Sequence, residues 1–395
     1  MMFRTLFLFT LACASSLTLA DQVITNKSPL RHKQTIKNAN NPHFEIANPR
    51  YVFNTAAQVL LVVSGDSNAL SIFKQNEQQK FQYSQSFSKQ HNHQLALEGA
   101  SDISYVIDSD IAIVSSFYSG SLSTFKRNDN GQFKHVETLS DHIDMKQAFR
   151  DYKKVRDKDT FKLIGAWDTL ISQDNKTLYV ASYQSNAVST FEVKSSGKLN
   201  FLGQLLPNHN WGKPTSIAQS KDANWLYISG FEQSKISILH REKGAKYRLS
   251  QSIAHGEKQI QTMQNPQQIV ITPDNQFLFV AASKSNSLNV FKRNASEYFE
   301  LIQVIDHKQT DGLSGACCIA YADKHNLVFA AGEADKGFLV FRQSPSSGEL
   351  TLIEHIKHSG LSNINGVSSI SLSQDGQRVF VTTGKNNEIF IFEII

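Results

Sequence analysis

One pattern recurs seven times along the 395-residue chain and limits what it can fold into. Each copy has an apolar triplet, a polar turn, a second β-like run and an apolar anchor, as in LYVASYQSNAVSTF and LFVAASKSNSLNVF. The anchors are Phe73, Phe125, Phe191, Leu239, Phe291, Phe341 and Phe392. Five of the six intervals between anchors are 48 to 52 residues long, and the remaining one is 66. A period near fifty predicts stacked copies of one supersecondary unit.

An aspartate precedes the apolar triplet by four residues in six of the seven copies, whereas the first copy has Ala56 there. These residues are Asp108, Asp174, Asp222, Asp274, Asp323 and Asp375. Asp followed by Asn or Gly is typical of a tight turn between strands. We therefore interpret the six aspartates as turn residues and not as metal ligands or acids.

Each unit accounts for four strands, because an alternating run such as FQYSQSF follows the anchor. Hydrophobic residues make up 40% of the chain, which allows a large core. Seven four-stranded units predict an all-β fold, a seven-bladed β-propeller of antiparallel strands over residues 43–395. The last copy ends after its third strand, so we expect segment 43–48, HFEIAN, to complete that blade and close the ring.

The N-terminus predicts export. Residues 1–20 carry Arg4, an apolar run and small residues before Asp21, which is typical of a secretory signal peptide. A lipoprotein signal at Cys13 is the alternative. We expect a polar linker over residues 21–42 and a periplasmic or secreted protein without a transmembrane segment. The net charge of +5 is spread thinly, which argues against nucleic acid as a partner.

Only Cys317 and Cys318 remain after cleavage, so no disulfide framework is expected. Adjacent Cα atoms lie about 3.8 Å apart, below the usual disulfide range, so a bond between them would be strained. We expect two reduced cysteines in a strand, with Cys318 aligned to the core positions Ile217, Ile269 and Ile370.

The segment Tyr179-Val180-Ala181-Ser182 follows an Asp turn and precedes an SNxxSxF-like run, as do Tyr227-Ile228 and Phe279-Val280. This pattern resembles the YVTN-type repeat of the lactonase-like seven-bladed propellers, and it covers residues 43–395. The resemblance implies 6-phosphogluconolactone hydrolysis, with His or Arg beside Pro at the start of each innermost strand. This chain carries Thr215-Ser216 and Gln267-Gln268 at such places, so the catalytic residues stay unassigned.

The loops after the fourth strands and the turns between the second and third strands should surround the channel mouth, a natural ligand site. We select five ligand-binding candidates there: Trp167, Asp168, His209, Trp211 and Lys213. The chain lacks the P-loop, GxSxG, HExxH and GxGxxG motifs, and we predict neither a metal site nor a cofactor.

A histidine follows the fourth strand in each internal loop: His91, His142, His209, His255, His307 and His358. They could form a ring of metal or ligand sites, or fix each loop by a hydrogen bond. The second interpretation is favoured, because equivalent rim positions lie too far apart to share one ion.

The 66-residue interval holds an insertion over residues 140–162. Met145, Phe149, Tyr152 and Val155 can share one helical face, with Asp141 helping to cap its start, so a short amphipathic helix is expected beside the channel mouth. It is either a solvated decoration or a lid or docking element.

Two functions follow. The first is an exported binding module that uses its loop face for a protein or small-molecule ligand. The alternative is a lactonase-like hydrolase of a sugar lactone or related ester.

Overall fold

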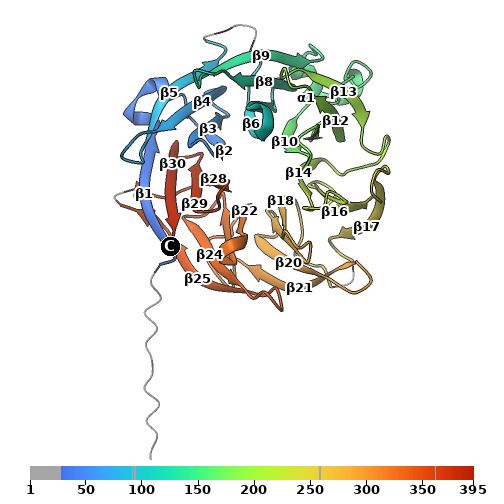
Figure 1. The fold of residues 1–395 in the computed structure, drawn as a ribbon. Helices are drawn as coiled ribbons and strands as arrows, with labels where there is room; N and C mark the ends of the chain where they lie inside the picture. Colours follow the sequence, from blue (N-terminus) through green and yellow to red (C-terminus); the bar gives the residue numbers. More distant parts are fainter. Residues whose placement is uncertain (1–27, 91, 93–94, 258, 361) are drawn as a thin grey trace, which may run out of the picture.

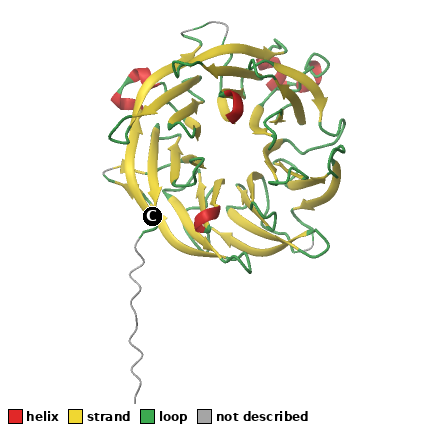
Figure 2. Cartoon of the chain, in the orientation of Figure 1, coloured by secondary structure: helices red, strands yellow, loops and turns green. Residues whose placement is uncertain are grey.

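The computed structural model describes residues 28–395 except 91, 93, 94, 258 and 361. Seven four-stranded antiparallel sheets form a ring around a central opening (Figure 1), which confirms the predicted propeller. Strands account for nearly all of its regular structure (Figure 2). Among the described residues, no helix has the length and hydropathy needed to cross a membrane.

Six blades are continuous in sequence, and each runs from the channel outward. They are β2 (Pro49–Asn54), β3 (Val59–Ser64), β4 (Ala69–Gln75) and β5 (Phe81–Ser88); β6 (Ala100–Val106), β7 (Ile111–Ser116), β8 (Ser121–Arg127) and β9 (Phe133–Ser140); β10 (Ala166–Ile171), β11 (Thr177–Ser182), β12 (Ala187–Val193) and β13 (Leu199–Gln204); β14 (Pro214–Gln219), β15 (Trp225–Gly230), β16 (Lys235–His240) and β17 (Arg248–Ala254); β18 (Pro266–Ile271), β19 (Phe277–Ala282), β20 (Ser287–Arg293) and β21 (Phe299–Asp306); β22 (Ala316–Ala322), β23 (Leu327–Gly332), β24 (Phe338–Gln343) and β25 (Leu350–Ile356). A two-residue hairpin, β26 (His358–Ser359) and β27 (Ser362–Asn363), follows the sixth blade.

The seventh blade joins the two ends of the chain. It contains β28 (Val367–Leu372), β29 (Arg378–Thr383) and β30 (Glu388–Ile394), and β1 (Leu30–Lys37) pairs with β30 as its outer strand. The prediction that segment 43–48 closes the ring is therefore wrong, and the linker predicted over 21–42 contains the closing strand. Segment 43–48 instead begins within the 3-10 turn Pro42–Phe44 and forms no strand, and its Ile46 is fully buried. The alternation of apolar residues in β1 is weak, which hid it from the sequence.

The core lies between blades. The second strands are buried on both faces because each sheet is covered by a neighbour on either side, and all six residues of β3 are buried. The seven anchors are all buried. A bulge at the anchor offsets the third and fourth strands, for example between Ile72 and Phe73.

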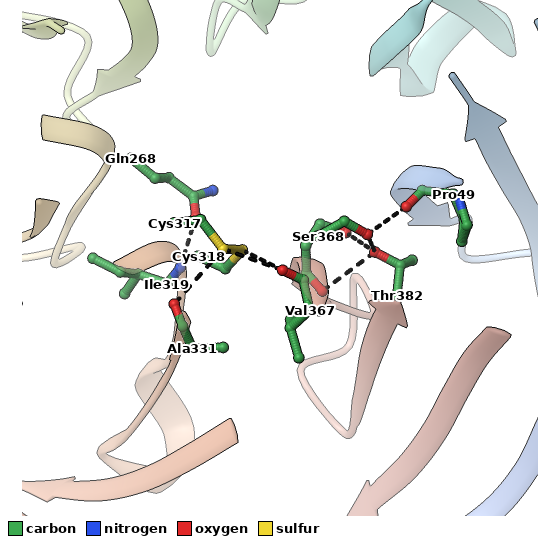
Figure 3. The surroundings of a disulfide bond; sticks show 10 residues. Pro49, Gln268, Cys317, Cys318, Ile319, Ala331, Val367, Ser368 and Thr382 are labelled. Atoms are coloured by element: carbon green, nitrogen blue, oxygen red, sulfur yellow. Dashed lines mark hydrogen bonds between the residues drawn. A yellow bond between two sulfur atoms is a disulfide. The ribbon is translucent and has the colours of Figure 1, made fainter. Parts of the chain in front are cut away.

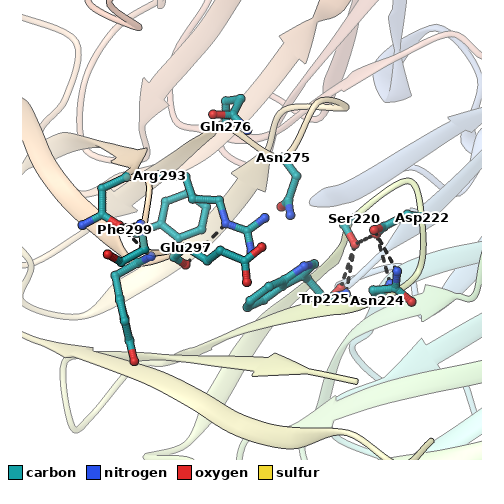
Figure 4. A network of polar contacts seen from close by, with 12 residues as sticks. Ser220, Asp222, Asn224, Trp225, Asn275, Gln276, Arg293, Glu297 and Phe299 are labelled. Carbon is teal, nitrogen blue, oxygen red and sulfur yellow. Dashed lines mark hydrogen bonds and ion pairs between the residues drawn. The ribbon is translucent and has the colours of Figure 1, made fainter. Parts of the chain in front are cut away.

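The six predicted aspartates lie in turns between first and second strands; Asp108 and Asp323 lie in 3-10 turns, and the other four share one contact. Asp222 accepts a hydrogen bond from Ser220 Oγ, which in turn accepts one from the amide of Trp225 at 3.0 Å (Figure 4). Asp174, Asp274 and Asp375 repeat the contact. In the same view the Arg293 guanidinium lies 3.9 Å above the ring centroid of Trp225, tying two blades together.

A glutamine links neighbouring outer strands at four blade junctions. Each side chain donates to the carbonyl and accepts from the amide of one residue in the next blade. The pairs are Gln34 with Phe81, Gln85 with Phe133, Gln251 with Phe299, and Gln303 with Leu350, at 2.7 to 3.2 Å.

The insertion forms the helix α1 (Met145–Arg150) and a 3-10 turn, Tyr152–Lys154. Its N-cap is Asp144, whose side chain accepts from the amides of Lys146 and Gln147, and not Asp141 as predicted. Asp141 accepts from the amide of Phe161 and closes the base of the loop instead.

Candidate functional site

Every innermost strand begins with the same irregularity. A bulge follows its first residue, so two consecutive side chains per blade are brought toward the channel. The bulged positions are Arg50, Ser101, Trp167, Thr215, Gln267, Cys317 and Ser368. The positions after them are Tyr51, Asp102, Asp168, Ser216, Gln268, Cys318 and Ser369. We call these sets the upper ring and the lower ring.

All members of both rings except Cys318 line one cavity of about 230 Å³. Its outer wall comes from turns between second and third strands, including Asp66, Phe117 and Tyr118. The cavity therefore opens on the face where the sequence predicted a ligand site.

The rings also bind the blades to one another. Upper-ring hydroxyls donate to a carbonyl of the next blade, as Ser101 does to Ala166 at 2.9 Å. Lower-ring side chains accept an amide proton from the next blade, as Gln268 does from Ile319 at 2.6 Å. These bonds fix the cavity wall, so its polar groups are held in place by the fold.

Two lower-ring carboxyl groups come from adjacent blades. Asp102 Oδ2 accepts from the amide and hydroxyl of Thr169, at 2.9 and 2.6 Å. Asp168 Oδ2 accepts from the amide of Ile217 at 2.6 Å. The side chain of Asp102 is buried, and that of Asp168 is partly exposed to the cavity.

The two carboxyl groups titrate together. Burial, and then the charge of Asp102, holds the pKa of Asp168 well above its ordinary value. Burial also raises the pKa of Asp102, although hydrogen bonds from Thr169 oppose that shift. Asp168 thus keeps its proton longer, and Asp102 is the carboxylate of the pair. A pair of one ionised and one protonated carboxyl group can accept and donate a proton.

Arg50 is the single basic residue in the lining of this cavity, which also holds Asp66, Asp102 and Asp168. Its guanidinium lies 5.7 Å from the ring centroid of Trp167. Tyr51 lies next to the carboxyl pair, and its pKa is raised by burial and by the charges of Asp102 and Asp168. With the pair sharing a proton, the lining has more negative than positive charge.

A sequence profile described as "Lactonase, 7-bladed beta-propeller" matches residues 160–395, more than half of the chain. The chain belongs to this lactonase family of seven-bladed propellers. The family membership agrees with the resemblance drawn from the repeats.

Individual relatives of this lactonase-family protein are distant. A 6-phosphogluconolactonase of Photorhabdus laumondii is 21% identical over 227 residues, which cover 57% of this chain and 65% of the relative. A protein from Lactobacillus plantarum has a TM-score of 0.65 at 16% identity, covering 82% of this chain and 87% of its own. A periplasmic gluconolactonase of Pseudomonas aeruginosa has a TM-score of 0.62 at 15% identity, covering 81% and 86%. At such identities the structural likeness concerns the fold alone.

Two of the five predicted ligand-binding residues of this lactonase-family protein, Trp167 and Asp168, line the cavity. Trp211 is instead buried in a core cluster, at 2% exposure, with His209 against its ring. Lys213 Nζ donates to the carbonyl of Gln184 at 3.2 Å. These three residues lie in a loop that folds back on the blades, and none of them is part of the cavity lining.

Arg50, Tyr51 and Asp102 line the cavity but were not among the predicted site residues. The signal was in the repeat: Asp102 lies 23 residues before its anchor Phe125, as Asp168 does before Phe191. The same register shows that the predicted alignment of Cys318 with Ile217, Ile269 and Ile370 is wrong by one residue. Cys318 is equivalent to Ser216, Gln268 and Ser369, and Ile319 aligns with the three isoleucines.

Cys317 and Cys318 are joined by a disulfide in the structure, in contrast to the expected reduced pair (Figure 3). Cys317 Sγ lies 3.3 Å from the carbonyl oxygen of Val367, in the place where the upper-ring serine Ser368 donates to Pro49. A disulfide sulfur carries no proton, so this is a contact and not a hydrogen bond.

The histidine loops do not share one arrangement. His255 Nδ1 accepts from the amide of Met263 at 3.4 Å, whereas His209 packs on Trp211, and His91 lies outside the described residues. A common loop-fixing hydrogen bond is therefore not found. Within the part of the chain that the structure describes, no cluster of three or more His, Cys, Asp or Glu could hold a metal ion.

Proposed function

We propose that the channel cavity binds an uncharged sugar lactone and hydrolyses it. The Asp102–Asp168 pair carries this proposal, because both carboxyl groups accept from the amide of Thr169 and line one small cavity. Burial and the charge of Asp102 raise the pKa of Asp168, so Asp168 is the proton donor of the pair and Asp102 the acceptor. Lactone hydrolysis needs one group to take a proton from water and another to give one to the departing ring oxygen.

In this mechanism the Asp102 carboxylate accepts a proton from water as the water oxygen bonds to the lactone carbonyl carbon. The ester bond to the ring oxygen then breaks, and Asp168 donates its proton to that oxygen. The product is the open-chain acid. Arg50 supplies the positive charge that favours the oxyanion formed in between.

The charge balance favours a substrate without phosphate. The cavity lining holds one guanidinium against Asp66 and the carboxyl pair, so a phosphate dianion would meet net negative charge. The likeness to a periplasmic gluconolactonase and the predicted signal peptide support the same choice, since sugar phosphates are intracellular metabolites. We propose a periplasmic or secreted location on this basis.

The test compares the hydrolysis of δ-gluconolactone and its 6-phosphate with the spontaneous rates. We expect catalysis of the neutral lactone, and a loss of at least about 100-fold in kcat for Asp168→Asn. Ser369→Ala, at an equivalent lower-ring position without a carboxyl group, is the matched control for changes in the ring itself. A lactone that raises the melting temperature without being hydrolysed would support the binding-module alternative, and equal rates in wild type and Asp168→Asn would overturn the mechanism.

A further inference from the structure

Tyr118 is a large aromatic residue exposed at the edge of the cavity, with a relative accessibility of 61% for the residue. It lies in the turn between β7 and β8, beside Phe117, and both line the cavity mouth. An exposed aromatic ring at a cavity edge is a common element of ligand sites.

The ring of Tyr118 is held by its surroundings. One side lies against Gly99, where a Cβ atom would approach Cδ2 to 2.5 Å, so only glycine leaves room for the ring. Gly99 also has a φ of +67°, which glycine adopts without strain. The rings of Phe117 and Phe149 meet Tyr118 edge-on at centroid distances of 5.1 and 5.8 Å.

The insertion provides part of this support. Phe149 belongs to α1 and stacks on Phe117 at 5.2 Å, and Gln184 Nε2 fixes the helix by donating to the carbonyl of Ala148 at 3.0 Å. Phe117 in turn meets Trp167 of the upper ring at 5.3 Å. A continuous row of aromatic rings thus leads from the cavity wall to its outer edge. We call Trp167, Phe117 and Tyr118 the aromatic row.

The volume of the cavity limits the size of the ligand that it can enclose, and so determines which part of a ligand would contact the aromatic row. At about 230 Å³ it is smaller than the roughly 300–1,000 Å³ of sites that enclose drug-sized ligands. It therefore suits a single small ring, and anything attached to that ring must lie at the mouth. The same cavity lining also holds the amide of Asn48, which donates to the carboxylate of Asp66 at 3.0 Å. Aromatic faces and polar groups in one lining suit a pyranose, which has apolar C–H faces and hydroxyl edges.

We infer that the preferred ligand is a disaccharide derivative, with its lactone ring in the cavity and its second pyranose stacked on Tyr118. This inference rests on the proposed lactonase function for the first ring. The second ring depends only on the aromatic row. Tyr118 would then determine the preference for disaccharide over monosaccharide lactones.

The experiment measures product binding, which does not depend on turnover. Calorimetric titration with gluconate and with cellobionate gives the ratio of their dissociation constants for the wild-type protein. We expect cellobionate to bind about tenfold more tightly, the range expected for one added aromatic contact. Tyr118→Ala should remove this preference, and Tyr118→Phe should keep it, since the ring face remains.

Two further variants separate the possible outcomes. Phe149→Ala removes the support of the Tyr118 ring and should reduce the preference, whereas Tyr298→Ala, an exposed tyrosine at 48% in another blade, should leave it unchanged. Equal affinity for gluconate and cellobionate, or an unchanged ratio in Tyr118→Ala, overturns the inference. Failure of the lactonase proposal has a different signature: the cellobionate preference persists, but no lactone is hydrolysed.

Discussion

Asp102 and Asp168 share one backbone donor: the amide nitrogen of Thr169 lies 2.9 Å from Oδ2 of the first and 3.0 Å from Oδ1 of the second. The shared donor holds two carboxyl groups of different blades in one arrangement. A proton between them then relieves the repulsion that two buried carboxylates would suffer. The pair thus lowers the free energy of unfolding of the propeller.

The stability cost of the pair should depend on pH. Folding raises the pKa of Asp168, first through burial and then through the charge of Asp102. The pKa of an Asp in the unfolded chain is about 3.9. Above that pH the native state therefore binds more protons than the unfolded chain. Stability from this group is therefore present in acid and lost as the pH rises through the raised pKa. Asp168→Asn removes the titration and keeps an acceptor for Ile217. We expect it to melt about 2–4 °C higher than wild type at pH 8, with the difference vanishing near pH 4.

Asp174 in a turn provides a control of opposite sign. Burial acts to raise the pKa of Asp174, but hydrogen bonds from Ser172 and the amide of Lys176 outweigh it and lower the pKa. Asp174→Asn should therefore lower the melting temperature at neutral pH and lose this effect on acidification. Melting curves from pH 4 to 9 check both variants, and parallel behaviour of the two would contradict the assignment.

The ring should depend on β1. Removing residues 1–37 deletes the outer strand of the seventh blade and exposes the edge of β30. We expect this truncation to lose cooperative thermal unfolding or to aggregate, as judged by circular dichroism and light scattering. A truncation of residues 1–27, which leaves β1 in place, is the matched control. Two truncations with the same melting temperature would show that the seam contributes little.

The glutamine links should contribute measurable stability. Gln303→Ala removes the side-chain donor to the carbonyl of Leu350 and the side-chain acceptor for its amide. Each hydrogen bond is worth about 1 kcal/mol. We expect the melting temperature to fall by about 2–4 °C. Gln85→Ala and Gln251→Ala act at separate junctions, so their effects should add.

The control for the glutamine series is Gln82→Ala, an exposed position on β5, the strand that also carries Gln85. It should change the melting temperature by less than about 1 °C. A loss as large as that of Gln85→Ala would mean that the side chain stabilises the strand by some means other than the junction.

The disulfide between Cys317 and Cys318 should be observable by alkylation. Intact-mass measurement of unfolded protein lacking residues 1–27 should find no alkylated cysteine before reduction and two afterward. Replacing both by serine should be tolerated, because the equivalent residues of the seventh blade are Ser368 and Ser369. Alkylation without reductant would contradict the disulfide. Failure of the double serine variant to fold would contradict the expectation that serine is tolerated at both positions.

Sequence predicted the repeated parts of the fold and missed the parts that occur once. The anchors and aspartate turns recur in nearly every blade, so the hydrophobic pattern and turn chemistry reinforce each other. Strand β1 has no such copy, and its burial is confined mainly to Leu30 and Ile36. Its place is determined by the partner edge on β30, which lies at the other end of the chain.

The sequence indicated two residues of the cavity lining, Trp167 and Asp168, and missed others, such as Asp102, that only the structure brings together. Trp167 and Asp168 stood out as aromatic and charged residues among hydroxyls and amides. Asp102 lies between serine and isoleucine in a strand-like segment, and only the blade register shows that it faces Asp168. His209, Trp211 and Lys213 lie outside the cavity lining, because the path of a loop depends on tertiary packing, which residue type does not reveal.

The seam between β1 and β30 also has a consequence for biosynthesis. Strand β1 has no partner until residues 388–394 emerge from the ribosome, when the other six blades have already been made. A chain that stops only eight residues early lacks that partner, although six of its blades are complete. Ring closure therefore requires residues 388–394, and products truncated before them carry an unpaired edge on β1.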